Sequence, residues 1–435
     1  MSPLLVGFGA VALMLVLMAV RVPIGLAMGI VAIGGMALIR GSGAAFAMIS
    51  SAPFDVAANW ELTAIPMFIL MGAFAHHAGL SASLFGAARL WVGNLPGGLA
   101  IAANFACAGF AAASGASTAT AAAMGRIAIP EMLKYGYDKG LATGVVAAGG
   151  TLGIMIPPSI GFVLYGIFAQ ISISKLLIAG ILPGLLTAAV YAVMIMVRCS
   201  LNPALAPRVG EHVPWSRRMA GLAEIWPLLF LVLAVIGGIY AGITTPTEAG
   251  AAGAAAALAI AVAQGRMTFP AFRSAVSETV ITTAKIFFIV IGAVLFSRLL
   301  AVAGVAPFLA GSVQNWASDP LLLLLGAAIL FVVLGMFLDA LGLMLLTLPI
   351  LLPMFEAAKL DLIWFGVLTI KFIEIGLITP PVGMNVYVIK SITGDRISLE
   401  TIFRGVGWFI GCEVLITFLL IAFPGISLFL PGLMG

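Results

Sequence analysis

Two apolar segments, each long enough to cross a bilayer, are interrupted near their middle by glycine and a pair of prolines. The first, 141–169, contains GGTLGIMIPPS at Gly149–Ser159, and the second, 362–390, contains GLITPPVG at Gly376–Gly383. Proline removes a backbone donor and clashes with the preceding turn, so regular helix should end just before each pair. Unpaired backbone at mid-membrane depth is tolerated only where protein covers it or where it lines a wet cavity. Each break is therefore predicted to contribute to a binding site.

The two interrupted segments are related by an internal repeat. The offset that aligns Gly153 with Gly376 also aligns further identical residues: Pro157 with Pro380, Pro158 with Pro381, Pro130 with Pro353 and Asp138 with Asp361. Gly and Pro are common in membrane helices, but the ordered Gly-x-x-x-Pro-Pro pattern in both halves favours duplication over chance. Repeated halves that each carry one interrupted segment are typical of secondary transporters.

Composition sets the class of the protein. Of its 435 residues, 63% are hydrophobic and only 8% are charged, whereas soluble domains are about 25% charged. The chain is therefore predicted to be an all-α integral membrane protein. The net charge of +4 is not evidence for a nucleic-acid partner, and none is expected, because Lys and Arg fall in loops rather than on one face. The cysteines are Cys107, Cys199 and Cys412. They have neither metal-site spacing nor an even count, so they are interpreted as small hydrophobic residues.

Apolar runs predict helices in each half of the chain. In the first half they lie near 4–20, 23–39, 60–78, 97–112, 119–134, 141–171 (broken) and 176–198. In the second half they lie near 222–242, 248–265, 277–303, 320–334, 341–356, 362–390 (broken) and 405–430. The segment 1–20 lacks a basic start and a cleavage site, so it is predicted to be a span rather than a signal peptide. The polar connection Cys199–Arg218 is predicted to divide the halves.

Two pairs of helices are too short and too closely joined to be ordinary spans. These pairs, 97–134 and 320–356, are predicted to be re-entrant hairpins that turn at Ala113–Thr118 and Gly335–Leu341. With both termini periplasmic and each hairpin returning to its own side, most Lys and Arg lie in the cytoplasm, as the positive-inside rule requires. The bases of the hairpins then lie on opposite sides of the membrane, so the repeat is inverted.

The motifs resemble those of a known family. The stretch GASTATAAAMGRIAIPEMLKYGYDKGLATGVVAAGGTLGIMIPPSIGFVLYG at 115–166 resembles the first signature of the large membrane subunit of TRAP transporters, the DctM-like family. GMFLDALGLMLLTLPILLP at 335–353, with EIGLITPPVGMNVYVI at 374–389, resembles the second, and IPMFILMGAFAHHAG at 65–79 supports the match. The resemblance covers nearly the whole chain.

This resemblance implies sodium-driven uptake across the bacterial inner membrane by an elevator-type fold of the ion-transporter superfamily. It also implies a periplasmic substrate-binding protein (DctP-like) and a small membrane subunit (DctQ-like), which we expect to be a separate polypeptide bound one-to-one to the scaffold. The expected division of the chain follows the family: scaffold helices 1–96, first hairpin and broken helix 97–175, connecting helix and cytoplasmic loop 176–221, scaffold helices 222–305, second hairpin and broken helix 306–400, and C-terminal helix 401–435.

Sodium is a hard cation, and carbonyls freed where a helix unwinds are suitable ligands at a helix C-terminal end. The first half offers carbonyls at three positions and hydroxyls at the hairpin tip: Gly149, Gly153 and Pro157, with Ser114, Ser117 and Thr118. The second half offers Gly335, Asp339, Gly376 and Thr379. The repeat aligns Asp339 with Ala116, so only the second half would offer a carboxylate at this position. The alternative for the hydroxyls is helix packing, since small polar residues join membrane helices.

The organic-acid substrate is expected to contact a second set of residues: Ser117, Arg126, Pro158, Pro381 and Asn385. Arg126 either attracts the anion or snorkels toward the cytoplasm. Lys371 and Glu374 are three apart on one helical face and are interpreted as a structural pair; the alternative is that Glu374 steadies the second break. His76 and His77 are interpreted as interfacial.

Other classes of function are less consistent with the sequence. An intramembrane enzyme would need a motif such as HExxH, a pair of catalytic Asp residues or Gly-x-Ser-x-Gly, and none occurs. A channel gives little reason for inverted broken helices. A stand-alone sodium–carboxylate symporter of the same superfamily remains the main alternative. The sequence does not specify which organic acid is carried.

Overall fold

The structure is a computed structural model that describes residues 2–207, 213–316 and 320–434, and these residues form helices and no strands. Met1, and Arg208 with the rest of 208–212 in the predicted connection, lie outside the described residues. Five described helices are long and apolar enough to cross a membrane, or up to eight spans if each bent pair counts as one. The prediction of an all-α membrane protein is confirmed.

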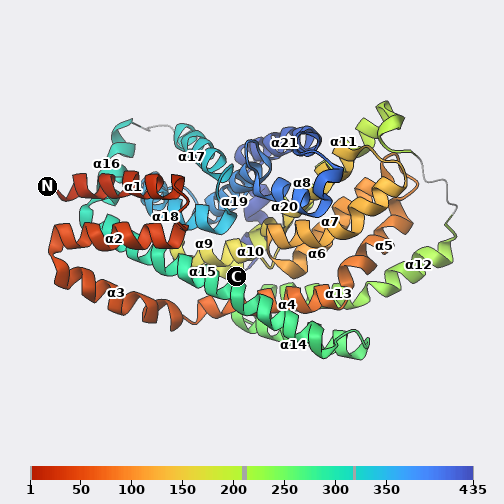
Figure 1. The fold of residues 1–435 in the computed structure, drawn as a ribbon, viewed down its shortest axis with the longest axis horizontal. Helices are drawn as coiled ribbons and strands as arrows, with labels where there is room; N and C mark the ends of the chain where they lie inside the picture. The colour runs from red at the N-terminus through yellow and green to blue at the C-terminus, as the bar shows by residue number, and fades with distance from the viewer. Residues whose placement is uncertain (1, 208–212, 317–319, 435) are drawn as a thin grey trace.

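Helices from both halves form a first group at one side of the elongated molecule (Figure 1). It consists of α1 (Pro3–Ala19), α2 (Ile24–Arg40), α3 (Ser42–Ala57), α4 (Ala64–His77), α13 (Trp226–Tyr240), α14 (Pro246–Ala263) and the long α15 (Phe269–Ala303). The helix α15 packs along α2 and α4, and α14 packs on α4. A Cβ on Gly292 of α15 would lie 2.4 Å from the carbonyl oxygen of Gly25 on α2. Glycine thus lets these two helices pack backbone to backbone.

The second group contains the two hairpins and the two broken helices. Hairpin one is α6 (Gly98–Ser114) with α7 (Ser117–Lys134), and hairpin two is α17 (Pro320–Gly335) with α18 (Ala340–Ala357). The broken helices are α8 (Lys139–Met155) with α9 (Ile160–Ala169), and α19 (Leu362–Ile378) with α20 (Met384–Thr393). The helix α11 (Ile181–Leu201) packs on α6 and α8, and α21 (Leu399–Ala422) packs on α8, α11 and α19.

Matched aspartates start the two broken helices. The Asp138 carboxylate accepts a hydrogen bond from Leu141 N at 2.8 Å, and the Asp361 carboxylate accepts from Ile363 N at 2.8 Å and Trp364 N at 3.0 Å. A carboxylate at the N-cap satisfies free amides and favours the positive end of the helix dipole. The residues aligned by the repeat therefore have the same structural role in both halves.

Short amphipathic helices join the groups. The helix α5 (Leu80–Val92) packs on hairpin one and on α12 (Trp215–Glu224), and α16 (Val305–Trp316) packs on α15 and on α18 of hairpin two. Arg89 of α5 forms an ion pair with Glu131 of α7 at 2.5 Å. The helix α16 follows α5 by nearly the same offset as the other repeated elements. Each hairpin is thus preceded by an equivalent connecting helix.

Several helix predictions were wrong in detail. The helices α3, α5 and α16 were not predicted, because their apolar runs are short or mixed with polar residues. The predicted helix 176–198 divides into α10 (Ile173–Ala179) and α11, and 222–242 divides at Ile225 between α12 and α13. The predicted polar connection ends in helix, since α12 begins at Trp215. The run 405–430 divides into α21 and α22 (Gly425–Gly432) next to Pro424.

Candidate functional site

Each broken helix is interrupted at its Pro-Pro pair. The helix α8 ends at Met155, α9 begins at Ile160, and their axes differ by 41°. The second break lies between Ile378 and Met384. Both Pro-Pro peptide bonds are cis. The last carbonyls of a helix have no regular intrahelical partners and lie at its negative end. At these breaks Ser159 Oγ donates to the Ile154 carbonyl and Thr379 Oγ1 donates to the Ile375 carbonyl, so only part of this set is engaged by side chains.

The two breaks differ in exposure. Pro157 and Pro158 in the first break are buried, whereas Pro380 and Pro381 in the second are exposed. The repeat is therefore symmetric in sequence and asymmetric in its surroundings.

Each hairpin tip is bound to the break of its own half. The carbonyl of Gly115 accepts a hydrogen bond from Ile160 N at 3.2 Å, and the carbonyl of Met336 accepts from Gly383 N at 3.0 Å. Ile160 and Gly383 are aligned by the repeat offset, so the amide that follows each Pro-Pro pair has the same role. Gly115 has φ +63°, a conformation that glycine adopts without strain.

Matched glycines allow the tips to approach the broken helices. A Cβ on Gly153 would lie 2.5 Å from the Ala116 carbonyl oxygen, and one on Gly376 would lie 2.8 Å from the Cα of Gly335. These distances exclude any side chain without movement of the tip. Three predicted sodium-site residues, Gly153, Gly335 and Gly376, therefore lie where a tip contacts a broken helix.

A cavity of about 100 Å³ separates the two tips. Tip one lines it with Gly115, Ala116, Ser117 and Thr118, tip two with Asp339, Ala340 and Leu341, and the breaks with Ile154, Ile160 and Leu377. A water occupies about 30 Å³ of liquid, so the space suits an ion with a few waters. The structure thus brings together three of the predicted ligands, Ser117, Thr118 and Asp339.

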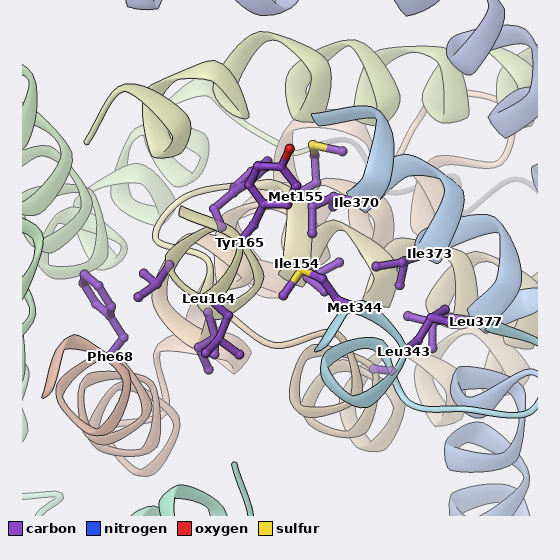
Figure 2. Close-up of a cluster of buried hydrophobic side chains, with 14 of the residues drawn as sticks. Phe68, Ile154, Met155, Leu164, Tyr165, Leu343, Met344, Ile370, Ile373 and Leu377 are labelled. Carbon is purple, nitrogen blue, oxygen red and sulfur yellow. The ribbon is translucent and has the colours of Figure 1, made fainter. Parts of the chain in front are cut away.

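The apolar floor beside this cavity is formed by both halves. In Figure 2 the side chains of Ile154 on α8 and Met344 on α18 lie close together, with Leu343 and Leu377 beyond them. All four are buried. Such a floor excludes water, and electrostatic interactions are stronger where water is excluded.

Hydrogen bonds already engage most of the predicted hydroxyls. Ser114 Oγ and Thr120 Oγ1 are 2.6 Å apart, and Thr379 Oγ1 donates to the Ile375 carbonyl at 2.6 Å. The Asp339 carboxylate accepts from Gly342 N at 3.0 Å and caps α18. Hydroxyl and carboxylate oxygens retain further lone pairs after these contacts. Their geometry is compatible both with helix packing and with ion ligation.

Ser117 and Asn385 join the two halves. Asn385 Nδ2 on α20 donates to Ser117 Oγ at 2.8 Å and to the Ala147 carbonyl at 3.0 Å. Both side chains are buried. Each residue was predicted to contact substrate, and their contact with each other was not predicted. The tip of hairpin one is thus held by the second broken helix.

A larger cavity of about 480 Å³ lies between α4 and α15 on one side and hairpin one on the other. Its walls include Ser114, Thr118, Arg126, His76 and Glu278. The exposed Arg126 forms no ion pair with another described residue. The Arg126 guanidinium lines this cavity and can form charge-assisted hydrogen bonds to an anion there. Both interpretations of Arg126 stay predictions.

Other predicted site residues do not line the cavity between the tips. Gly149 is inside the regular part of α8, where a Cβ would contact Cys107 of α6 at 3.0 Å, and its carbonyl belongs to the helix ladder. The carbonyl of Pro158 approaches Gly115, while Pro381 faces outward at the second break. These residues are not gathered around one cavity.

A buried charged cluster lies before the second break. Lys371 Nζ is 2.6 Å from both Glu374 and Glu413 and donates to Thr187 Oγ1 at 3.0 Å. Tyr191 OH donates to Glu413. The predicted Lys371–Glu374 pair is therefore part of a larger cluster. Glu413 was missed, although a lone carboxylate in the apolar run 405–430 was a signal for it.

The sequence of this chain is similar to those of one family of transporter subunits. The family model of the tripartite ATP-independent periplasmic transporter, DctM component, matches residues 11–426. The C4-dicarboxylate TRAP transporter large permease protein DctM of Pseudomonas aeruginosa is 37% identical over 389 residues, covering 88% of each chain. The sialic acid TRAP transporter large permease protein SiaM of Vibrio cholerae is 32% identical over 413 residues, covering 94% of this chain and 95% of that one.

A solved structure shares the fold. The crystal structure of the Alcanivorax borkumensis YdaH transporter matches with a TM-score of 0.63, covering 89% of this chain and 90% of that chain. The two are only 16% identical in sequence, so the likeness concerns the arrangement of helices alone.

Proposed function

Because this chain belongs to the family of the DctM component of tripartite ATP-independent periplasmic transporters, we propose that it carries a small organic acid inward by sodium-coupled elevator transport. It is a large permease subunit and a multi-pass protein of the inner membrane. The observation that carries the proposal is the cavity between the two hairpin tips, each tied to the break of its own half.

Sodium is the proposed coupling ion. Ser117, Thr118 and Asp339 supply oxygen at the cavity, and the breaks supply carbonyl groups at helix C-terminal ends. A carboxylate with neutral oxygens suits a hard monovalent cation. The volume of about 100 Å³ matches an ion rather than an organic acid. Gly153, Pro157, Gly335, Gly376 and Thr379 would complete the ligand set.

The substrate is proposed to occupy the larger cavity next to hairpin one. Arg126 supplies a cation there, and Thr118, which lines both cavities, connects this one with the ion site. The named relatives carry C4-dicarboxylate and sialic acid, which are both organic acids. Arg126 recognises the carboxylate shared by such compounds. The proposal specifies the carboxylate of the substrate and no other part of it.

The elevator proposal rests on the two groups of helices. Hairpins and broken helices with α11 and α21 would slide as a unit against α1–α4 and α13–α15. The connecting helices α5 and α16 would follow the movement. A small membrane subunit (DctQ-like) would support the scaffold, and a periplasmic binding protein (DctP-like) would deliver substrate to the periplasmic side, where both termini are proposed to lie.

Reconstituted vesicles test the proposal. The chain, a small subunit and a binding protein are combined in proteoliposomes with a labelled organic acid bound by that binding protein. We expect uptake only with an inward sodium gradient and with all three components. Sodium-independent uptake would contradict the coupling. Uptake by the chain alone would favour the stand-alone sodium–carboxylate symporter.

A further inference from the structure

A long apolar groove lies on the outer side of the molecule between α11 and α21. It has a volume of about 790 Å³, and its apolar walls include Val193, Val197 and Leu415. Val193 and Leu415 are more than half exposed. The lining of α11 extends from Ala189 to Leu201, which at a rise of 1.5 Å per residue is about 18 Å. This length is close to the thickness of one leaflet, which is half of a hydrocarbon core about 30 Å thick.

One end of the groove carries a cation that lacks a full set of partners. Arg198 lies in the last turn of α11, and its guanidinium lies 5.1 Å from the ring centre of Trp408 on α21. Its Nη1 atom is buried and has no hydrogen-bond acceptor among the described residues. Guanidinium groups carry five N–H donors and bind phosphate through two of them at once. The free donor therefore indicates an anionic ligand.

The surroundings of this end favour an anion as well. Asp138 N donates to the Leu205 carbonyl at 2.8 Å, so the start of α8 lies beside the end of α11. Lys134 and Lys139 lie on either side of Asp138 in the chain, so these three residues together carry one net positive charge. Arg198 at the end of α11, with the Trp408 ring against it, is a combination typical of the membrane interface. Basic pockets between membrane helices at this depth bind lipid headgroups.

We propose that this groove is a binding site for an anionic phospholipid. The phosphate of the lipid accepts hydrogen bonds from Arg198 and Asn202, and one acyl chain lies along the groove from Leu201 to Ala189. The polar residues at one end and the apolar walls along the rest match the two parts of such a lipid. A free phosphate would satisfy the guanidinium and leave the groove uncovered.

Thermal unfolding of the delipidated full-length chain in detergent tests the site. Phosphatidylglycerol should raise the melting temperature more than phosphatidylcholine does, and inorganic phosphate alone should have little effect. In Arg198→Gln the apparent affinity for phosphatidylglycerol should fall about tenfold or more, which corresponds to the loss of one charge-assisted contact. Arg404→Gln is the matched control, because Arg404 lies on α21 with an exposed partner, Glu400, and outside the groove.

A second pair of variants tests the groove itself. Val193→Trp fills it and should lower lipid retention in native mass spectrometry, while Leu185→Trp adds the same side chain at an exposed position of α11 outside it. Equal stabilisation by phosphatidylcholine, or full stabilisation by phosphate alone, would overturn the proposal. Unchanged lipid retention in both Arg198→Gln and Val193→Trp would also overturn it.

Discussion

Asp339 has two physical roles that a single substitution can separate. Its carboxylate caps α18 and also lines the cavity between the tips. Asparagine caps a helix about as well as aspartate but carries no charge for a cation. We therefore expect Asp339→Asn to keep its thermal stability and to lose sodium-dependent uptake, with a sodium requirement raised at least about tenfold. Asp339→Ala should lose the uptake and also about 1 kcal/mol of stability.

The matched control for this prediction is Asp361→Asn. Asp361 caps α19 in the same way, and it lies at the far end of that helix from the break. It should leave the sodium dependence of uptake unchanged. Wild-type sodium dependence in Asp339→Asn would remove this carboxylate from the ion site.

Lys371 is expected to be important for stability because it lies between two buried carboxylates. Lys371→Met leaves Glu374 and Glu413 uncompensated, and removing one partner of a buried ion pair destabilises proteins by about 3–5 kcal/mol. Thermal unfolding of the purified protein should show the loss. The triple variant Lys371→Met, Glu374→Gln, Glu413→Gln should be less destabilised than the single one.

Lys139→Met is the control for that series. Lys139 is exposed at the start of α8, so its replacement should change stability by less than about 0.5 kcal/mol. A single Lys371→Met variant as stable as the wild type would contradict the interpretation of this cluster as a buried, charge-compensated unit.

Residue types were easier to predict than their partners. Ser117 and Asn385 were each named from the sequence, but they are far apart in the chain and their hydrogen bond depends on how α20 packs on α7. Tyr191 and Thr187 are ordinary polar residues of an apolar helix, and only the fold places them on the Lys371 cluster. Side-chain chemistry is local, whereas these contacts are set by tertiary packing.

At the scale of elements, the glycine contacts determine how each hairpin is seated. Gly153→Ala should force the tip away from the first break, because its Cβ would lie 2.5 Å from the Ala116 carbonyl. We expect a loss of about 1–3 kcal/mol in thermal unfolding together with a strong loss of uptake. Gly376→Ala should behave alike at the second break.

Gly237→Ala gives the comparison for these variants. Gly237 lies inside α13, and a Cβ there would contact nothing within 4 Å. Alanine favours helix over glycine by up to about 1 kcal/mol, so this variant should be neutral or slightly stabilised. A Gly153→Ala protein with normal uptake would show that the tip tolerates displacement.

The hairpins and breaks were predictable because glycine and proline interrupt helices by local sterics. The helices α3, α5 and α16 were not predictable in this way, because their apolar runs are short. Their helical state depends on packing against α2, α6 and α18. The division of 176–198 and 222–242 also depends on tertiary turns. Local signals therefore predicted where helices stop better than where short ones form.

At the scale of the whole molecule, the two groups of helices predict where a small subunit binds. Its helices should lie on the first group, whose exposed surface includes Leu233 of α13 and Phe46 of α3. A photo-crosslinker at Leu233 should capture the small subunit. The same crosslinker at Phe418 of α21, which is similarly exposed, should capture lipid instead.

The number of small subunits bound to each chain can be measured independently of where they bind. We expect one small subunit per chain by native mass spectrometry. Crosslinks from the small subunit to Ser117 or Thr379 would contradict its placement. A stable, transport-competent homodimer of this chain alone would contradict the need for it.

The unequal exposure of the two Pro-Pro breaks has a consequence for how one conformation relates to another. The halves are built alike but face opposite surroundings, with the first break covered and the second open. If each half adopted the arrangement now held by the other, the covered break would become the open one with little change in either fold. We therefore expect the opposite end state of the proposed elevator cycle to have the first break open and the second break covered.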